Sequence, residues 1–443
     1  MLATLVDLPD PDGGGPIVAP AAVLEELTDQ FLTSDRVVRL ATTSGRHDHL
    51  VRQDGTALDV GGAREPEFST TAMLAVQARA LRTYRAGIGS GTGTVPPTVV
   101  AETLSRFPDL TAEQGHLVAS FCTSGDTAQS GVGRPGTGKT HGMRAAVAAW
   151  EAAGYRVLGA AVKAEAARHL GDECGIPAEP LAWYLNRIAD PTHSPLNDRT
   201  VLIVDEASTI SDRDLDKLAW LCDQTGATLR LIGDPAQHSS VNAGGLWRVV
   251  TRRHQRRTPE LVEGRRVRHA GDRAAAEALR EGHATVALAE LEAAGHLHLV
   301  DDDRDLYVQL LARWWGARQD GAPHPMVDRR NDQRLVLNRL ARAMRRHRGE
   351  LGDTEIVAAG DRRYAVGDEV TARMGDRALH PQGHPANYIR NGAHGVVTAV
   401  HPGAIPDQDV IVVAYGALGA IPVPRSFFDE HTDQWGRTDV GID

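Results

Sequence analysis

A glycine-rich loop that ends in lysine and threonine constrains the fold of this chain more than any other feature. It runs Gly133-Arg134-Pro135-Gly136-Thr137-Gly138-Lys139-Thr140, in the form G-x4-G-K-[ST]. Its glycines let the backbone curl so that N–H groups converge on phosphate oxygens, and a helix directly after it adds the positive end of its dipole. We expect the whole loop to cradle a nucleotide, with Lys139 on the β- and γ-phosphates and Thr140 on Mg²⁺. The segment before it, 128–132, is a poor strand by composition, and the alternative is a glycine-rich turn before a surface helix.

The composition fits a multidomain globular protein. At roughly 150 residues per domain, 443 residues predict two to four domains, and 42% hydrophobic residues exclude wholesale disorder. No apolar run approaches the ~20 residues that a membrane-spanning helix needs, and residues 1–20 lack the pattern of a secretory signal. The three cysteines, Cys122, Cys174 and Cys222, lack metal-ligand spacing, which fits a reducing compartment. We therefore expect a cytoplasmic protein without a membrane contact, a disulfide framework or a zinc site.

The basic residues are almost all arginine, because only Lys139, Lys163 and Lys217 among the 48 are lysines. This bias is typical of a GC-rich genome, and it makes a lysine in the glycine-rich loop informative. The 58 acidic residues leave a net charge of −10, so the chain as a whole repels nucleic acid. Arginine clusters at 248–273 and 329–348 could still line a groove for a phosphate backbone. The alternative is helix faces whose arginines pair with nearby acids.

Apolar runs alternate with helical stretches from about residue 110 to residue 250. The apolar runs are 157–162, 201–204 and 228–232, and the helical stretches include 140–152, 163–170 and 212–223. This alternation predicts an α/β fold, with a parallel sheet that helices cover on both faces. From about residue 353, short β runs with glycine and proline turns suggest a small β-barrel.

Two further segments place polar residues at strand ends. Val201-Leu202-Ile203-Val204 ends in Asp205 and Glu206, and Leu231-Ile232-Gly233-Asp234-Pro235-Ala236-Gln237 ends in a polar turn. Open α/β sheets bind ligands at the carboxyl edge, so we expect the loop and the acid pair to face each other across neighbouring strand ends. Asp205 would hold Mg²⁺ through water, Glu206 would deprotonate the attacking water, and Gln237 would touch a γ-phosphate. The alternatives are a structural strand end and a β-turn on Asp-Pro.

These three segments, in this order, resemble superfamily 1 DNA helicases. The match is closest to the branch with the exonuclease V alpha-type helicases and the helicase part of the conjugative relaxases (MobF, TraA/TraI-like). Leu110-Thr111-Ala112-Glu113-Gln114 looks like that branch's Q motif, which implies that Gln114 bonds the adenine edge; a helix N-cap at Thr111 is the alternative, and both can hold together. Glu260-Leu261-Val262-Glu263-Gly264-Arg265-Arg266 resembles motif IV, which implies that Arg266 is an arginine finger; a solvated basic stretch is the alternative.

The resemblance covers most of residues 20–435 and implies four parts. These are an N-terminal accessory domain (1–95), a first P-loop RecA-like ATP-binding domain (96–258), a partial second RecA-like domain (259–350) and a small SH3-like β insertion with the end of the chain (351–443). The family's later motifs, Thr-x-His-x-x-Gln-Gly and the arginine-bearing motif VI, do not occur in this sequence. We therefore expect a truncated helicase whose missing motifs a separate chain could supply.

Two functions follow as hypotheses. The first is an ATP-binding and ATP-hydrolysing DNA helicase or translocase, with Mg²⁺ as cofactor and single-stranded DNA as partner. Trp247, Trp314 and Trp315 could stack bases in such a protein, or pack in the core. The alternative is a nucleotide-binding module that binds DNA or a partner without motor activity.

Overall fold

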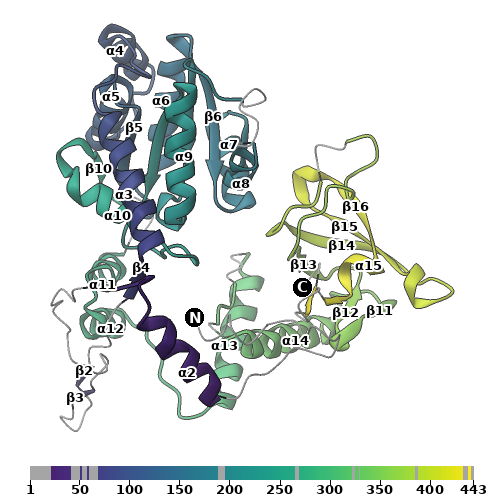
Figure 1. Ribbon diagram of the computed structural model, residues 1–443. Helices are drawn as coiled ribbons and strands as arrows, with labels where there is room; N and C mark the ends of the chain where they lie inside the picture. Colours follow the sequence, from purple (N-terminus) through teal and green to yellow (C-terminus); the bar gives the residue numbers. More distant parts are fainter. Residues whose placement is uncertain are drawn as a thin grey trace, which may run out of the picture. The chain divides into compact units, whose positions relative to one another are not determined.

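The chain divides into two compact units in the computed structural model, one over Ala21–Leu297 and one from His298 onward. The structure describes residues 21–40, 50–51, 57–58, 68–187, 195–264, 269–321, 325–328, 330–384, 388–432 and 438–440. No helix within these ranges combines the length and the apolar composition needed to cross a lipid bilayer. Each unit is described by itself below, and Figure 1 labels the elements of both.

A six-stranded parallel sheet forms the centre of the first unit. Its strand order is β10-β5-β9-β8-β6-β7, and every neighbouring pair is parallel. The strands are β5 (Ala128–Gly133), β6 (Arg156–Ala161), β7 (Ala178–Pro180), β8 (Thr200–Val204), β9 (Thr228–Gly233) and β10 (Glu260–Leu261). All carboxyl ends of the strands therefore meet at one edge, and the predicted P-loop RecA-like α/β sheet is confirmed.

Helices cover both faces of this sheet (Figure 1). On one face lie α4 (Pro97–Ser105), α5 (Ala112–Thr123), α6 (Lys139–Ala152) and α7 (Ala164–Cys174). On the other lie α3 (Thr71–Ala86), α8 (Leu181–Leu185), α9 (Asp212–Thr225) and α10 (Leu246–Arg253). Successive side chains of a strand point to opposite faces of the sheet. In β8, Val201 and Ile203 therefore pack on the face covered by α4–α7, and Leu202 and Val204 pack on the face covered by α3 and α8–α10.

Strand β5, which leads into the glycine-rich loop, is fully buried although its composition predicted a poor strand. Its small residues fit because neighbouring helices press against them. A Cβ added to Gly131 would lie 2.8 Å from the Phe121 ring of α5. The Ser130 backbone N–H donates to the buried Tyr84 hydroxyl of α3 at 3.1 Å. A central strand with such close neighbours needs small side chains rather than large apolar ones.

In the N-terminal part of the first unit, α3 is the element that joins the helices on one face of the sheet. Thr70 caps α3 by accepting a hydrogen bond from the Met73 N–H at 3.1 Å. Helix α3 then packs on α9, where Arg79 pairs with Asp216 and Gln77 donates to Asp212 at 2.6 Å. The elements before α3 are α2 (Ala21–Leu32), β1 (Val37–Arg39), β2 (Leu50–Val51), β3 (Ala57–Leu58) and β4 (Phe68–Thr70).

The sheet also extends past the boundary expected at residue 258, since β10 pairs with β5. Helices α11 (Ala270–Glu281) and α12 (Ala284–Ala293) then pack against each other at the end of the first unit. The two compact units, which divide between Leu297 and His298, therefore do not coincide with the four parts expected from the sequence. Contacts between segments distant in sequence decide where a unit ends, and local composition does not reveal them.

A buried cation fixes the C-terminal end of α5. Arg230 of β9 donates to the Phe121 carbonyl through Nε and Nη2 at 3.0 and 2.9 Å, and to the Asp126 carbonyl through Nη1 at 2.9 Å. Its side chain is fully enclosed, and this burial lowers the pKa of Arg230 to about 10. The guanidinium satisfies carbonyls that the helix end would otherwise leave without donors.

The second unit combines two long helices with an antiparallel sheet of order β13-β14-β15-β16 and a β11-β12 hairpin. The helices are α13 (Asp303–Gln319), α14 (Asn331–His347) and α15 (Arg425–Phe428). The strands are β11 (Glu355–Val357), β12 (Arg363–Ala365), β13 (Glu369–Thr371), β14 (His394–His401), β15 (Val410–Ala414), β16 (Ala420–Pro424), β17 (Glu430–Thr432) and β18 (Thr438–Val440). The described residues between 262 and 354 form helices only, so the expected partial second RecA-like domain has no strand there.

Arginines of α14 are held by acids of the same unit. Arg342 donates to the Asp368 carboxylate at 2.9–3.1 Å, and Arg345 donates to Glu350 at 3.0 Å. Burial would raise the pKa of Glu350, but the hydrogen bond from Arg345 and the charge of Arg318 hold that pKa below its ordinary value. The pKa of Glu355 is lowered against burial in the same way, first by its hydrogen bond from Arg363. These arginines of the 329–348 cluster are therefore paired with nearby acids, which is the alternative to a groove for a phosphate backbone.

Candidate nucleotide-binding site

The glycine-rich loop connects β5 to α6 at the carboxyl edge of the sheet. Gly136 and Gly138 have φ angles of 75° and 74°, in the left-handed region that favours glycine. A Cβ on Gly138 would lie 2.4 Å from the Gln114 amide nitrogen. A Cβ on Gly133 would lie 2.4 Å from Cγ of Lys139. The loop conformation thus depends on glycine at these positions, and it presents the N-terminus of α6 to a ligand.

Lys139 folds back over its own loop. Its Nζ donates to the Gly133 carbonyl at 3.1 Å, which uses one of its three ammonium donors. Within the described residues the other two donors have no partner, and the Thr140 hydroxyl makes no hydrogen bond. Both groups are therefore available to a phosphate or a metal ion at the loop.

Asp205 and Glu206 follow β8 at the same edge. Oδ1 of Asp205 accepts from the Glu206 N–H at 2.8 Å, and the Asp205 N–H donates to the Ala160 carbonyl at 2.9 Å. Glu206 has a φ of 52°, which is rare for a residue other than glycine and marks backbone strain. Such strain is found preferentially at functional sites, so it supports a role for this turn beyond ending the strand.

A buried thiol, Cys174, lies beside the start of the helix that follows the glycine-rich loop. Cys174 Sγ lies 3.8 Å from the backbone carbonyl of Thr140, to which it donates. Burial raises the pKa of Cys174 to about 12, and the charge of Asp205 is the next largest cause. The backbone of Thr140 thus contacts this sulfur, and the charge of Asp205 acts on the same thiol. Their hydroxyl and carboxylate oxygens are the hard ligands that Mg²⁺ prefers, so these residues fit that ion.

The loop strand and the acid-bearing strand are not direct neighbours, which corrects the sequence expectation. Strand β9 lies between β5 and β8. Its end carries Asp234, whose side chain is 1% exposed and accepts from the Ala236 N–H at 3.0 Å. The exposed Gln237 closes the turn, because its N–H donates to the Asp234 carbonyl at 3.1 Å. The β-turn that the sequence offered as the alternative is present in the middle of the strand-end edge, and the contact of Gln237 with a γ-phosphate stays a prediction.

Gln114 lies beneath the loop, and its hydrogen bonds are made to protein. Its Oε1 accepts from the Thr111 N–H at 2.9 Å, which completes the capping box of α5. Its Nε2 donates to the carbonyls of Thr137 at 2.9 Å and Gly138 at 3.3 Å. The side chain is buried, so the N-cap alternative is what the structure contains. Adenine recognition by Gln114 stays a prediction, and this conformation leaves neither of its amide hydrogens free.

Arg266 lies outside the described residues, but the chain just before it runs beside the loop. The Arg134 N–H donates to the Leu261 carbonyl at 3.1 Å. A Cβ on Gly264 would lie 3.7 Å from the Pro135 carbonyl oxygen. The motif IV segment therefore starts next to the glycine-rich loop, and the role of Arg266 stays a prediction.

Two residues of α11 reach the site and were not expected from the sequence. Glu277 pairs with Arg134 of the loop at 2.5 Å, and Arg280 pairs with Asp234. Residues three apart share one face of a helix, so a single face of α11 contacts both the loop and the end of β9. Glutamate and arginine at this spacing are common on surface helices, which is why the sequence alone did not single them out.

The parallel sheet, the glycine-rich loop and the acids at the strand ends define a P-loop NTPase with a RecA-like fold. Residues 109–302 match the AAA domain family. Two similar proteins are the conjugal transfer protein TraA of Agrobacterium fabrum and the probable conjugal transfer protein TraA of Sinorhizobium fredii. The first is 29% identical over 88% of this chain and 33% of its own length, and the second 30% over 68% and 26%.

These matches confirm the resemblance to the helicase region of conjugative relaxases in superfamily 1. The chain spans about a third or less of the length of these curated relatives. A solved structure, that of PRRSV helicase, is 14% identical over 57% of this chain and 50% of that chain, with a TM-score of 0.20. A score that low supports no argument about this chain.

Proposed function

We propose that this chain binds ATP with Mg²⁺ and hydrolyses it as a DNA helicase or translocase. One observation carries the proposal: the glycine-rich loop, the Asp205-Glu206 pair and the Asp234 turn all lie at one edge of a parallel sheet. Phosphoryl transfer depends on positioned charges at such an edge. The similarity to TraA proteins supports the use of this chemistry on DNA.

The roles follow from the chemistry of each group. Lys139 and the N-terminus of α6 neutralise phosphate charge. Thr140 and Asp205 would hold Mg²⁺, which neutralises charge on the β- and γ-phosphates when bound. The Glu206 carboxylate has no hydrogen-bond donor among the described residues, so it is free to accept the proton of the attacking water. Gln237 is exposed on the central turn and would contact the γ-phosphate of a bound nucleotide.

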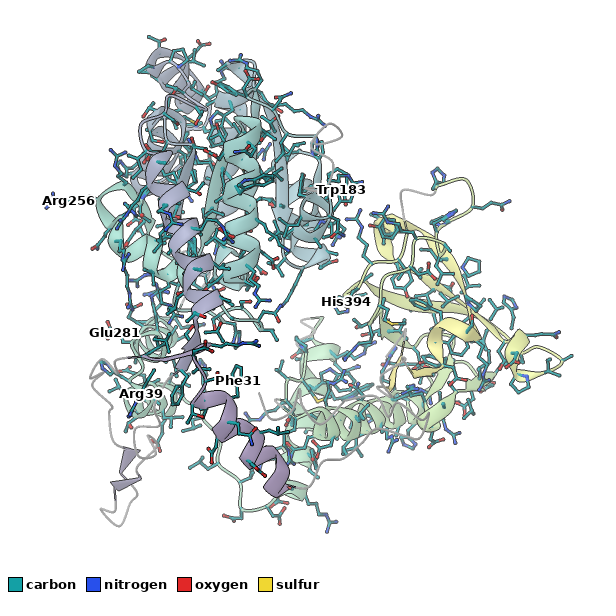
Figure 2. The ribbon with its side chains drawn as sticks, in the orientation of Figure 1. Phe31, Arg39, Trp183, Arg256, Glu281 and His394 are labelled. Atoms are coloured by element: carbon teal, nitrogen blue, oxygen red, sulfur yellow. The ribbon has the colours of Figure 1, made fainter. Side chains whose placement is uncertain are left out.

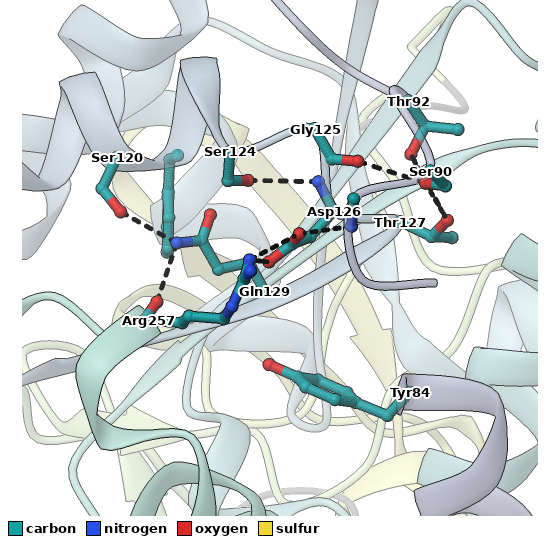
Figure 3. A network of polar contacts seen from close by, with 12 residues as sticks. Tyr84, Ser90, Thr92, Ser120, Ser124, Gly125, Asp126, Thr127, Gln129 and Arg257 are labelled. Carbon is teal, nitrogen blue, oxygen red and sulfur yellow. Dashed lines mark hydrogen bonds and ion pairs between the residues drawn. The ribbon is translucent and has the colours of Figure 1, made fainter. Parts of the chain in front are cut away.

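The basic segment after α10 is the DNA contact that we favour. A hollow of about 380 Å³ is lined by Arg252, Arg253, His254, Gln255, Arg256 and Arg257. Because this segment precedes β10, it lies at the amino edge of the sheet, away from the nucleotide. Asp126 pairs with Arg257 at 3.0 Å, and Gln129 donates to the Arg257 carbonyl at 2.8 Å, which fixes the segment (Figure 3).

Three arginines of this segment have no acidic partner in the part of the chain that the structure describes. They are Arg252, Arg253 and Arg256, all exposed, and Arg256 lies on the outside of the first unit (Figure 2). Burial, and then the charges of Arg85, Arg257 and Arg253, lower the pKa of His254, so several arginines act on this side chain together. A phosphate backbone is the anion that such a row of arginines suits. Trp247, by contrast, is 3% exposed and packs in the core.

ATP hydrolysis with and without single-stranded DNA tests the motor proposal. We expect DNA to stimulate the wild-type chain. Lys139→Ala should abolish nucleotide binding, and Glu206→Gln should slow hydrolysis by about 10²–10⁴ while nucleotide still binds. Bound nucleotide with background turnover in the presence of DNA would instead indicate a binding module without motor activity. Absence of nucleotide binding would refute both functions.

DNA binding in the absence of nucleotide tests the basic segment separately. The double variant Arg252→Ala/Arg256→Ala should weaken binding of single-stranded DNA, and it should reduce the slope of log K against log salt by about 0.7 per lost phosphate contact. Arg106→Ala is the matched control, because Arg106 is exposed but already paired with Glu102 at 2.9 Å. Equal salt slopes for both variants would place the DNA contact elsewhere.

A further inference from the structure

We propose that Arg280 is a further phosphate-contacting residue, one that makes the site prefer nucleoside triphosphates over diphosphates. The inference rests on the proposed nucleotide binding, and it adds a residue that the glycine-rich loop and the acidic pair do not include. It starts from the position of Arg280 over the central strand end.

Arg280 reaches the middle of the site from α11. Its partner Asp234 ends β9, and β9 lies between the loop strand β5 and the acid-bearing strand β8. The Asp234 side chain is 1% exposed and that of Arg280 is 20% exposed. The guanidinium therefore covers the carboxylate at the central strand end, between the groups proposed to bind phosphate and Mg²⁺.

The guanidinium has donors left after pairing with Asp234. Arginine carries five N–H donors in a fixed planar fork, and only Nη1 bonds to Asp234. One turn earlier on α11, Glu277 pairs with Arg134 of the loop. This second ion pair holds α11 against the loop, so the position of Arg280 does not depend on Asp234 alone.

The charge balance explains the expected preference. Among the described residues, Asp234 is the only acid that pairs with Arg280. A triphosphate brings a terminal phosphoryl group with additional negative charge to this edge, and the remaining N–H groups can donate to it while Asp234 keeps Arg280 in place. A diphosphate lacks that group, so its affinity should depend little on Arg280. A purely structural ion pair would affect both nucleotides alike.

Nucleotide titrations of the full chain separate these outcomes. In Arg280→Ala, the affinity for Mg²⁺·ATPγS should fall about tenfold to a hundredfold, while the affinity for Mg²⁺·ADP stays within about twofold. Arg280→Lys retains a charge for Asp234 but not the fork, and should lie between these limits. Arg199→Ala, which removes an exposed arginine at the opposite edge of the sheet, should change neither affinity.

Other results would overturn the inference. An equal loss for both nucleotides in Arg280→Ala would make Arg280 a structural residue, and unchanged affinities would exclude any role in binding. If the alanine variant does not fold, Arg280→Lys still tests the inference. A ratio of ATPγS affinity to ADP affinity equal to that of the wild type in this variant would refute a role for the guanidinium fork. Failure of the wild-type chain to bind either nucleotide would instead refute the proposed function itself.

Discussion

Replacing Gln114 by leucine distinguishes two roles of this side chain. One is to brace the glycine-rich loop through hydrogen bonds, and the other is to recognise the adenine base. Leucine keeps much of the volume and removes both polar groups. It leaves the buried Thr137 carbonyl and the Thr111 N–H without the partners they now have at 2.9 Å. A buried polar group without a partner costs about 1–3 kcal/mol, and the partly exposed Thr111 can recover some of this from water. We therefore expect a loss of about 2–4 kcal/mol in the free energy of unfolding of the first unit.

Thermal unfolding with and without nucleotide measures this loss. A destabilisation of that size should lower the Tm of the transition that nucleotide shifts by about 4–8 °C. The affinities for ATP and GTP should fall by the same factor, because the loop that both bind is no longer braced. His116→Ala, an exposed position on the same helix, is the control and should change neither quantity.

The opposite pattern would refute the bracing role. An unchanged Tm, combined with a loss of affinity for ATP but not for GTP, would show that Gln114 reads the adenine base. The hydrogen bonds to Thr137 and Gly138 would then have to open when nucleotide binds.

Three more mutational experiments have expected results that follow from burial, charge and close contacts. Arg230→Ala should cost about 3–5 kcal/mol in urea unfolding, because it leaves a cavity and carbonyls without donors, whereas the exposed Arg199→Ala should cost less than about 1 kcal/mol; similar losses would contradict this. Glu350 and Glu355 have a pKa below the ordinary 4.5 in the folded chain, so their contribution to stability is present above pH 4.5 and is lost as the pH falls through the lowered values. Replacing both by glutamine should flatten the acid limb of the second unit's pH–stability curve, and an unchanged curve would exclude their role. Gly133→Ala should reduce binding of a fluorescent ATP analogue at least tenfold, because the new methyl group would lie 2.4 Å from Cγ of Lys139 and displace that side chain; wild-type binding would show that the loop tolerates it.

Local patterns predicted the features that depend on local chemistry. The glycine-rich loop and the buried strand before Asp205 each follow from a few consecutive residues, and the structure contains both elements. The N-cap at Thr111 is local for the same reason, since the Thr-x-x-Gln spacing brings side chain and backbone together. The parallel sheet followed from the alternation of apolar and helical segments.

Features that depend on distant contacts were missed. Strand β5 lacks large apolar residues because α3 and α5 press against it, and this packing is invisible in its own composition. The Arg280–Asp234 pair joins residues on different elements, so it depends on where α11 docks. The placement of β9 between β5 and β8 is a matter of topology, which apolar periodicity does not specify.

The chemistry of the three cysteines makes this chain convenient for site-specific labelling. All three are buried, and burial raises the pKa of each thiol to about 12. At neutral pH each is therefore almost entirely the thiol rather than the thiolate, the form that attacks a maleimide. A single cysteine introduced at an exposed position of α11 would therefore react first, and a fluorophore there could follow the helix during turnover without removal of any native cysteine.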